Sequence, residues 1–212
     1  LYQHDPVRVL FPAQPPGDVV EAALVTTSGG LVGGDRIDIE VRAEQGARMI
    51  AVQQAAEKIY GSAGEDCLIN VNLAADEDAW LEYLPQETIL FDRSRLRRNT
   101  QVQLHPTARM IAGEMLVFGR IGSGERMESG LIRDAWDVSV DGRRVWAEAL
   151  HLDGDIGRAL DHPAGLGGAI TLATALYTGA DAADHLAAAR DMLAENAHVI
   201  AGAPLVKGTL VA

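Results

Sequence analysis

Alternation of apolar and polar residues with a period of two runs through most of the chain and constrains its fold more than any other feature. In the segment IDIEVRA, residues 37–43, the side chains of Ile37, Ile39 and Val41 share one side and charged residues occupy the other. The same alternation recurs in INVNLA (69–74), QVQLH (101–105) and WDVSV (136–140). Because successive side chains of an extended strand point to opposite faces, each segment is typical of a strand with one buried and one solvated face.

Short turn-forming segments separate these strands. They include AEQGA (43–47), AADED (74–78), GSGE (122–125) and VDGRR (140–144). Many short strands with such regular turns predict a mainly β fold of largely antiparallel strands, in a sandwich-like or helically wound all-β arrangement. No linker divides the strands into groups, so residues 1–212 are expected to form a single domain. The strand pattern is cut at both ends, and we expect residues to be missing there.

The last quarter of the sequence departs from the strand pattern. The segment DAADHLAAARDMLAENAH, residues 181–198, predicts a helix with Asp181 as its N-cap and an apolar stripe along one face. Before it, DIGRALDHP (155–163) indicates a helical turn and AITLATALYTG (169–179) indicates a strand. The chain is therefore expected to contain one or two helices toward its C-terminus.

The overall charge and composition exclude several classes of protein. The formal net charge is −12, so nucleic acid is not an expected partner, because little in the chain offsets the repulsion of phosphates. Apolar residues make up 48% of the chain, enough for a core, but no run of about 18 of them predicts a membrane span. The single cysteine, Cys67, permits no disulfide framework, and the N-terminus lacks the pattern of a signal peptide. We therefore expect a cytoplasmic protein without membrane association.

The segment SGGLVGGDR, residues 28–36, is rich in glycine and admits two interpretations. A phosphate-binding loop requires GxxxxGK[ST], or G-x-G-x-x-G at the start of a helix, but here Asp35 and Arg36 follow the glycines and a strand comes next. The structural interpretation is a tight bend between two strands, where glycine permits positive φ and close backbone approach. Leu31 and Val32 would then pack under the bend or face a partner. Asp35 would bond to the turn backbone or act as a free anionic group.

Four acidic residues lie in or beside the distinctive segments. They are Asp35, Glu57 in QQAAEKIYGS (53–62), Glu87 in LEYLPQETILFD (81–92) and Glu114 in GEMLVFGRIGSGE (113–125). An acid beside buried strand residues needs a partner or a path to water. Lys58 and Tyr60 follow Glu57, and a short surface connection with a solvated lysine explains that segment as well.

A basic cluster contrasts with the acidic remainder of the chain. Arg93, Arg95, Arg97 and Arg98 follow Asp92 in quick succession. Guanidinium groups form strong paired hydrogen bonds with carboxylates, so the four arginines are candidates for binding a partner's acidic groups. A solvated basic turn explains the same residues without a partner.

Sequence motifs for catalysis and for a tightly bound metal are lacking. The six histidines show no HxH, HExxH or HxxxH spacing, and one cysteine cannot build a thiolate site. No G-x-S-x-G motif nominates a nucleophile, so we expect neither an enzyme nor a tightly bound cofactor. Scattered carboxylates form at most weak, transient sites for a divalent metal.

Taken in order, these segments resemble the urease accessory protein UreD family, called UreH in some systems. The matching segments are SGGLVGGDR (28–36), QQAAEKIYGS (53–62), LEYLPQETILFDRSRL (81–96), GEMLVFGRIGSGE (113–125) and DGRRVWAEALHLDGD (141–155). The combination of GGLVGGD with LPQETILFD at this separation is specific, and the resemblance covers most of the chain. The family often has Thr-Lys-x-Tyr-Arg where this chain has EKIYG, so the chain departs from the pattern at Glu57 and lacks a basic group after Tyr60.

The resemblance implies both a function and a fold. UreD is a non-enzymatic scaffold that binds UreF, and through it the GTPase UreG, contacts the urease apoprotein, and assists nickel delivery to urease. The family fold is all-β with a pair of helices, and its helically wound strands enclose a polar tunnel proposed as the nickel route. On this basis the tunnel-lining candidates for transient nickel(II) are Asp35, Glu57, Glu87 and Glu114, with Lys58 and Tyr60 as gating or orienting residues.

Two other functions stay open at this point. One is an enzyme or binding module that holds an anionic ligand at the glycine-rich segment and the arginine cluster. The other is a β-sandwich interaction module unrelated to metals.

Overall fold

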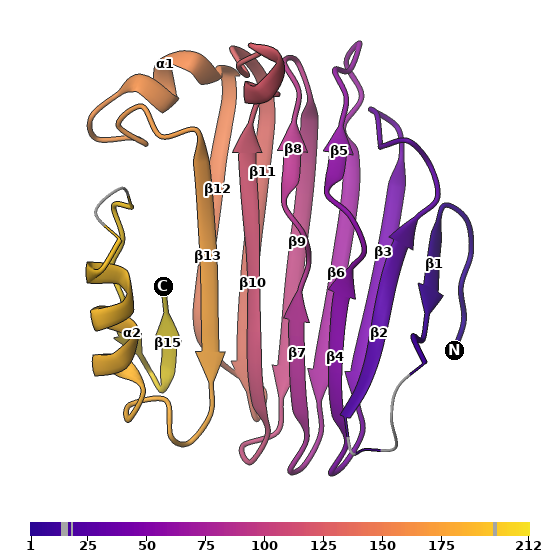
Figure 1. Cartoon of the computed structure of the whole chain (residues 1–212), viewed down its shortest axis with the longest axis vertical. Helices are drawn as coiled ribbons and strands as arrows, with labels where there is room; N and C mark the ends of the chain where they lie inside the picture. Colours follow the sequence, from indigo (N-terminus) through magenta and orange to yellow (C-terminus); the bar gives the residue numbers. More distant parts are fainter. Residues whose placement is uncertain (14–16, 18, 197–198) are drawn as a thin grey trace.

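Two β-sheets packed face to face make up most of the structure, whose computed structural model describes residues 1–13, 17, 19–196 and 199–212. Sheet A contains β1 (Val7–Leu10), β2 (Val19–Thr26), β4 (Arg48–Gln53), β5 (Glu57–Ile59), β7 (Trp80–Leu84), β8 (Thr88–Leu90), β10 (Arg109–Phe118), β13 (Thr171–Thr178), β14 (Leu205–Val206) and β15 (Thr209–Val211). Sheet B contains β3 (Arg36–Ala43), β6 (Cys67–Ala75), β9 (Arg95–Leu104), β11 (Ser129–Val140) and β12 (Arg143–Asp155). Figure 1 shows one sheet behind the other, with α1 (Ile156–Asp161) and α2 (Leu186–Ala194) on the C-terminal side.

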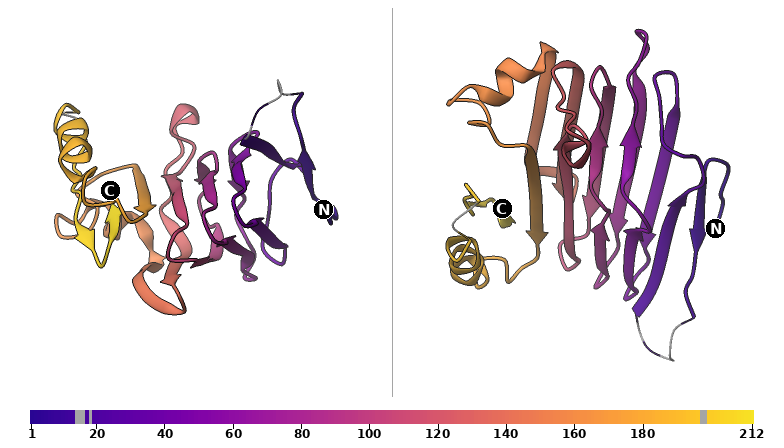
Figure 2. Two further views of the ribbon diagram at one scale, coloured as in Figure 1. Left: turned by 90° about the horizontal axis from the view of Figure 1, so that it is seen from below. Right: turned by 45° about the horizontal axis from the view of Figure 1, so that its top comes forward.

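The chain winds helically, because it alternates between the two sheets as it advances. After β2 in sheet A it crosses to β3 in sheet B, returns to β4, crosses to β6, and continues through β7, β9, β10 and β11 in the same way. Each circuit adds a strand to each sheet beside the strand of the previous circuit, and Figure 2 shows the resulting stack from two further directions. The predicted mainly β, helically wound fold with helices toward the C-terminus is confirmed.

The predicted largely antiparallel pairing is wrong for the body of the fold. Eight of the thirteen strand pairings among the described residues are parallel, including β2–β4–β7–β10 in sheet A and β3–β6–β9–β11 in sheet B. Antiparallel pairs occur toward the two ends, where β1 joins β2 and the later strands form hairpin-like pairs. The turns at 43–47, 74–78 and 122–125 join strands of opposite sheets, whereas the turn at 140–144 joins β11 to β12 within sheet B. A strand therefore meets its neighbour a full circuit later, running in the same direction.

The inner faces of the two sheets form the core between them. Leu81, Met110 and Leu116 point inward from sheet A, and Leu73 and Leu96 point inward from sheet B, all at 2% exposure or less. Complete burial of such a side chain stabilises the fold by about 1.5–3 kcal/mol. The apolar phase of the alternation thus marks the core-facing side of the strands in both sheets.

The helices differ in detail from the sequence prediction. α1 lies within the predicted helical turn, and the Asp155 carboxylate accepts a hydrogen bond from a backbone N–H of its first turn at 3.0 Å. α2 begins only at Leu186, and the predicted N-cap at Asp181 is wrong. The Asp181 carboxylate instead accepts a hydrogen bond from the Tyr177 hydroxyl at 2.5 Å. Residues 197–198, the end of the predicted helix, lie outside the described residues. Neither described helix is both long and apolar enough to cross a membrane.

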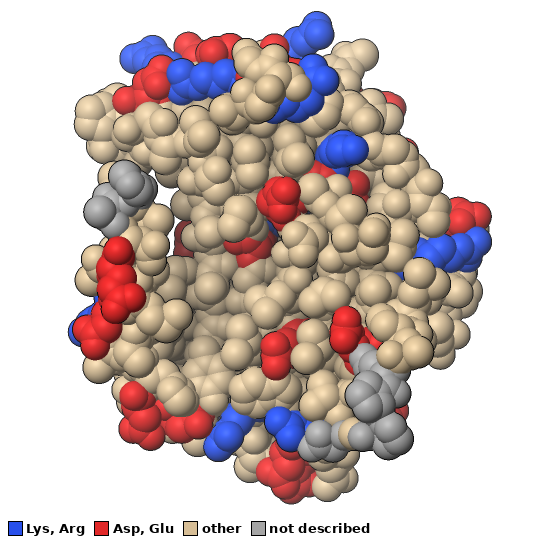
Figure 3. All heavy atoms as spheres, viewed as in Figure 1, with Lys and Arg blue, Asp and Glu red and all other residues tan. Residues whose placement is uncertain are grey.

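The outer face of sheet A is largely apolar, although Glu82 and Arg109 also lie on it. Leu10, Ala23, Val52 and Leu84 stand in register across β1, β2, β4 and β7, and we call them the apolar row. Met115 on β10 extends this face and is 42% exposed. Figure 3, which views the molecule as in Figure 1, shows a broad and mostly uncharged surface with a few acidic groups on it and basic groups mainly toward its edges.

The outer face of sheet B is polar. Glu40, Asn72, Gln101 and Asp137 stand in register across β3, β6, β9 and β11, and we call them the polar row. The predicted strands with one buried and one solvated face therefore describe sheet B well. In sheet A, by contrast, the strands carry mostly apolar side chains on both faces, and only the inner face is buried.

Candidate functional site

The glycine-rich segment is a bend that crosses from β2 in sheet A to β3 in sheet B. Gly33 lies where the bend touches another loop, since a Cβ atom there would come within 2.1 Å of the Ser62 hydroxyl oxygen and 2.3 Å of the Glu65 carbonyl oxygen. Leu31 is buried beneath the bend, whereas Val32 is 43% exposed. The predicted bend with close backbone approach is confirmed.

Four backbone amides of this bend, those of Leu31, Val32, Gly34 and Asp35, donate hydrogen bonds within the protein. The N–H groups of Leu31 and Gly34 donate to carbonyl oxygens at 2.7 and 3.1 Å, and the Val32 N–H donates to the Asp35 carboxylate at 2.8 Å. An anion site at a glycine loop requires free amides that converge on the ligand. This geometry gives the phosphate interpretation no support. The Asp35 carboxylate accepts a hydrogen bond from the turn backbone, in agreement with the structural interpretation of this residue.

The strand alternation of β5 separates Glu57, Lys58 and Tyr60. Glu57 faces the interior with 6% exposure and accepts hydrogen bonds from the Thr26 hydroxyl at 2.6 Å and the Lys58 backbone N–H at 3.2 Å. Burial raises the pKa of the Glu57 carboxyl above its ordinary value. The Lys58 side chain is exposed. The Tyr60 hydroxyl donates to the Gly29 carbonyl oxygen at 2.9 Å, so this ring fastens the glycine-rich bend.

β9 divides the arginine cluster between its two faces. Arg95 and Arg97 point outward and share the Asp66 carboxylate, with N–O distances of 2.7 and 2.5 Å. Arg93 precedes the strand and is exposed. Arg98 points inward and is only 6% exposed, so a surface cluster of all four arginines does not exist. The cause is strand geometry, which sends adjacent side chains to opposite faces.

Arg98 joins the two sheets through a buried cluster of charges. Its guanidinium donates to both carboxylate oxygens of Asp134, the in-register residue of the neighbouring strand β11. From sheet A, the Glu114 carboxylate lies 2.7 Å from Nη2 of Arg98, and the Thr88 hydroxyl accepts from Nη1 at 3.2 Å. We call Arg98, Asp134 and Glu114 the interior charge cluster.

The interior charge cluster perturbs the acidity of its members. Burial raises the pKa of Glu114 to about 7, although the Arg98 guanidinium acts in the opposite direction; the Asp134 carboxylate adds to the rise. Burial also opposes the charge on Arg98, but the carboxylates of Glu114 and Asp134 raise the pKa of Arg98 above its ordinary value. The cluster therefore holds a permanent cation, and Glu114 changes its charge near neutral pH.

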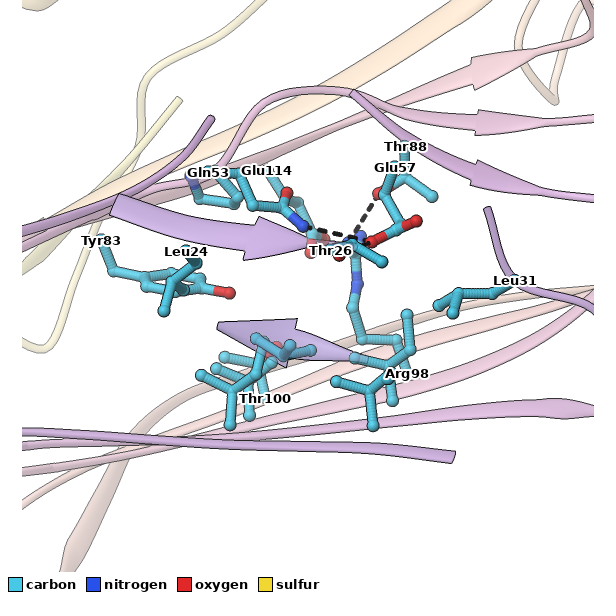
Figure 4. Close-up of a pocket in the computed structure, with 16 residues that line it drawn as sticks. Leu24, Thr26, Leu31, Gln53, Glu57, Tyr83, Thr88, Arg98, Thr100 and Glu114 are labelled. Atoms are coloured by element: carbon cyan, nitrogen blue, oxygen red, sulfur yellow. Dashed lines mark hydrogen bonds and ion pairs between the residues drawn. The ribbon is translucent and has the colours of Figure 1, made fainter. Parts of the chain in front are cut away.

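Two small cavities adjoin the interior charge cluster. The first has a volume of about 30 Å³, and its polar lining includes Thr26, Gln53, Glu57, Thr88, Arg98 and Glu114. Figure 4 shows Arg98 reaching into this space toward Glu57 and Thr88. The second has a volume of about 10 Å³, and its polar lining includes Glu114, Asp134, Trp136, Glu148 and Thr174. Because a water molecule needs about 10–15 Å³, the first cavity has room for about two waters and the second for one at most.

The structure brings together two of the four predicted acids. Glu57 and Glu114 line the same cavity, whereas Asp35 lies in the glycine-rich bend and Glu87 lies half-buried before β8; neither is among the residues that line the two cavities. Among the residues that the structure describes, no group of three or more His, Cys, Asp or Glu could hold a metal ion. A role of these acids in carrying nickel stays a prediction.

The sequence interpretation missed Asp134, Thr88 and Trp136. Asp134 stands in the same phase of the alternation as Trp136, which is the apolar phase of β11. Arg98 likewise stands in phase with Leu96, which is fully buried. A charged residue in the apolar phase of a strand is the sequence signal of a buried ion pair, and both members of this pair carry it.

Comparisons with known proteins agree with one another. The model of the family described as UreD urease accessory protein matches residues 1–212. A urease accessory protein UreD of Magnetococcus marinus is 51% identical over 195 residues, which are 92% of this chain and 68% of the relative. Urease accessory protein UreD 3 of a Bradyrhizobium species is 44% identical over 183 residues, 86% of this chain and 66% of the relative. The UreD of a Rhodopseudomonas palustris strain is 44% identical over 177 residues, 84% of this chain and 64% of the relative. The chain thus spans about two thirds of the length of these curated relatives.

Proposed function

Because the chain belongs to the UreD urease accessory protein family, we propose that it acts as a non-enzymatic scaffold in urease maturation. In this proposal it binds UreF, and through UreF the GTPase UreG, and it contacts the urease apoprotein. It then assists the delivery of nickel(II) to the urease active site in the cytoplasm. Nickel is the cargo of this process and is bound only transiently.

The uncovered outer face of sheet A is the observation that carries the proposal. A sheet face that meets water usually presents polar side chains, as the polar row of sheet B does. The apolar row and Met115 instead leave large side chains exposed, with Leu10 at 57% and Leu84 at 38%. Contiguous apolar surface of this kind marks a protein interaction site. We assign this face to UreF.

The interior carboxylates support the transport part of the proposal. Glu57 and Glu114 face one cavity between the sheets, beside hydroxyl and amide groups. Carboxylate, hydroxyl and water oxygens bind divalent cations without the thiolate or imidazole groups that would retain nickel tightly. A carrier that must release its cargo needs donors of this type.

Two measurements on one preparation test the proposal. The chain is expected to capture UreF in a pull-down and, together with UreF and UreG, to support nickel-dependent activation of urease apoprotein. Glu57→Gln is expected to lower activation severalfold while UreF capture is unchanged, because it removes a buried carboxylate that faces the interior cavity and not the outer face. Glu44→Gln, an exposed acid, is the matched control and is expected to change neither. A chain that captures no UreF and supports no activation would contradict the proposal.

A further inference from the structure

One carboxylate interrupts the apolar outer face of sheet A. Glu82 points outward from β7, and its in-register neighbours are Ile50 on β4 and Ile111 on β10. Trp80 and Leu84 flank it along its own strand on the same face, because side chains two residues apart in a strand share a face. The half-buried Glu82 side chain therefore has apolar or aromatic neighbours both across the strands and along its own strand.

An aromatic pair fixes the position of this carboxylate. The Trp80 indole Nε1 donates to Oε1 of Glu82 at 2.8 Å. The Trp80 ring lies beside the Tyr177 ring of β13, with 6.3 Å between the ring centroids, and the Tyr177 hydroxyl donates to Asp181 at 2.5 Å. Oε2 of Glu82 has no hydrogen-bond donor among the residues that the structure describes. The carboxylate is thus held in place with one oxygen available to a partner.

No cation in the described part of the chain balances the charge of Glu82. None of the ion pairs between described residues includes this side chain. Arg109 stands in register with Trp80 on β10, but it pairs with Asp181, with 3.5 Å between Nη2 and the carboxylate. Glu82 therefore depends on solvent while the face is open.

A partner that covers this face removes that solvent. Burial of an ionised carboxylate is costly unless a cation pairs with it, so a purely apolar partner surface is disfavoured here. A guanidinium meets the requirement well, because it can donate to Oε2 of Glu82 and stack on the Trp80 ring. The face thus combines a general apolar attraction with one charge requirement that discriminates among apolar partners.

We propose that Glu82 is the residue by which the outer face of sheet A selects its partner, and that the partner presents a cationic side chain to it from an otherwise apolar surface. The apolar row and Met115 supply contact area, and Glu82 supplies the selection. The inference rests on the proposed function for the identity of this partner, UreF, and adds the charge that UreF brings to the face.

Neutralisation of Glu82 tests the pairing by the sign of its effect. Isothermal titration with UreF compares the wild type with Glu82→Gln, which keeps the length of the side chain and an oxygen acceptor for the Trp80 N–H. We expect Glu82→Gln to bind UreF about 10-fold more weakly or worse, because the partner's cation is then buried without its carboxylate. Glu40→Gln, which neutralises an exposed acid of the polar row on sheet B, is the matched control and is expected to bind as the wild type does.

A second background tests where the cation comes from. The double variant Glu82→Gln, Arg109→Gln is compared with Arg109→Gln alone in the same titration. We expect Glu82→Gln to cost the same factor in both backgrounds, since the cation belongs to UreF. A loss that vanishes in the Arg109→Gln background would assign the cation to this chain and overturn the inference.

Thermal melting establishes that each variant is folded before titration. Unchanged or tighter binding of UreF by Glu82→Gln would overturn the inference, because a carboxylate buried without a cation opposes binding and its neutralisation favours it. Wild-type capture of UreF together with urease activation would in that case leave the proposed function intact. A wild type that neither binds UreF nor supports activation would contradict the proposed function and the inference together.

Discussion

Sheets A and B bury their inner faces in the same way and differ on their outer faces. The apolar row crosses sheet A as Leu10, Ala23, Val52 and Leu84, whereas the polar row crosses sheet B as Glu40, Asn72, Gln101 and Asp137. Apart from β1, which pairs antiparallel with β2, both rows run across parallel strands built by the same winding of the chain. The difference therefore lies in the residues and in what each face is adapted to meet. Sheet B meets water, and sheet A has the composition of a covered surface.

Asp134 and Asp137 lie on opposite faces of β11 and provide the largest expected contrast. Asp134→Ala is expected to cost about 3 kcal/mol of unfolding free energy, because it removes the carboxylate that binds two N–H groups of the buried Arg98 and leaves Glu114 as its remaining carboxylate partner. Asp137→Ala removes an exposed ion pair with Arg144 on the outer face of sheet B and is expected to cost less than about 1 kcal/mol. Urea unfolding of both variants measures the difference. Equal losses would mean that the outer face of sheet B is not simply solvated.

The glycine-rich bend fixes the crossing between the two sheets. Gly33→Ala is expected to destabilise the fold by about 1–3 kcal/mol, because the new methyl group collides with Ser62 and Glu65. Gly29→Ala is the matched control, since a Cβ atom there meets nothing within 4 Å, and it is expected to be close to neutral. Thermal melting checks both. A neutral Gly33→Ala would show that the bend tolerates more space than the close approach indicates.

The pH dependence of stability separates the buried acid of sheet A from the exposed acids. The pKa of Glu114 is raised to about 7 in the folded state from an ordinary value of 4.5, so the folded state binds more protons between these pH values. Its contribution to unfolding free energy therefore falls as pH rises from about 4.5 to about 7. Glu114→Gln is expected to remove roughly 1–2 kcal/mol of this fall. Urea titrations at pH 5 and pH 7 measure the unfolding free energy of the wild type and of Glu114→Gln. The same change between the two pH values in both proteins would contradict the burial of an acidic group at position 114.

The smallest expected effect is on the isolated chain when the outer face of sheet A is made polar. Leu84 and Met115 are 38% and 42% exposed, so replacing both by lysine is expected to change the unfolding free energy by less than about 1 kcal/mol. The same variant is expected to reduce self-association at high protein concentration, because it interrupts the apolar surface. Light scattering and chemical unfolding measure the two quantities. A large loss of stability would mean that these side chains belong to the core.

The sequence predicted the elements better than their assembly. Alternation in residues 37–43 and 136–140 correctly located strands of sheet B, and the glycines at 29–34 correctly indicated a bend. Pairing direction was not predictable, because parallel circuits and antiparallel hairpins share the same period of two.

The candidate site was only partly predictable for a related reason. Glu57 and Glu114 lie in distinctive segments of the sequence, and the structure brings them to one cavity. Arg98 stands among other arginines in the sequence although its phase matches the buried Leu96, and no motif marks Asp134. Their contact depends on the in-register pairing of β9 with β11, which no local pattern of the sequence encodes.

The affinity of the chain for UreF tests the central claim most directly. Isothermal titration compares Leu84→Lys, Met115→Lys on sheet A with Asn72→Lys, Gln103→Lys on sheet B, two double variants that change the net charge equally. We expect the sheet A variant to weaken UreF binding at least 100-fold, since burying two unpaired charges costs more than about 2.8 kcal/mol, and the sheet B variant to bind as the wild type does. Wild-type affinity in the sheet A variant, or an equal loss in both, would contradict the assignment of the apolar face to UreF.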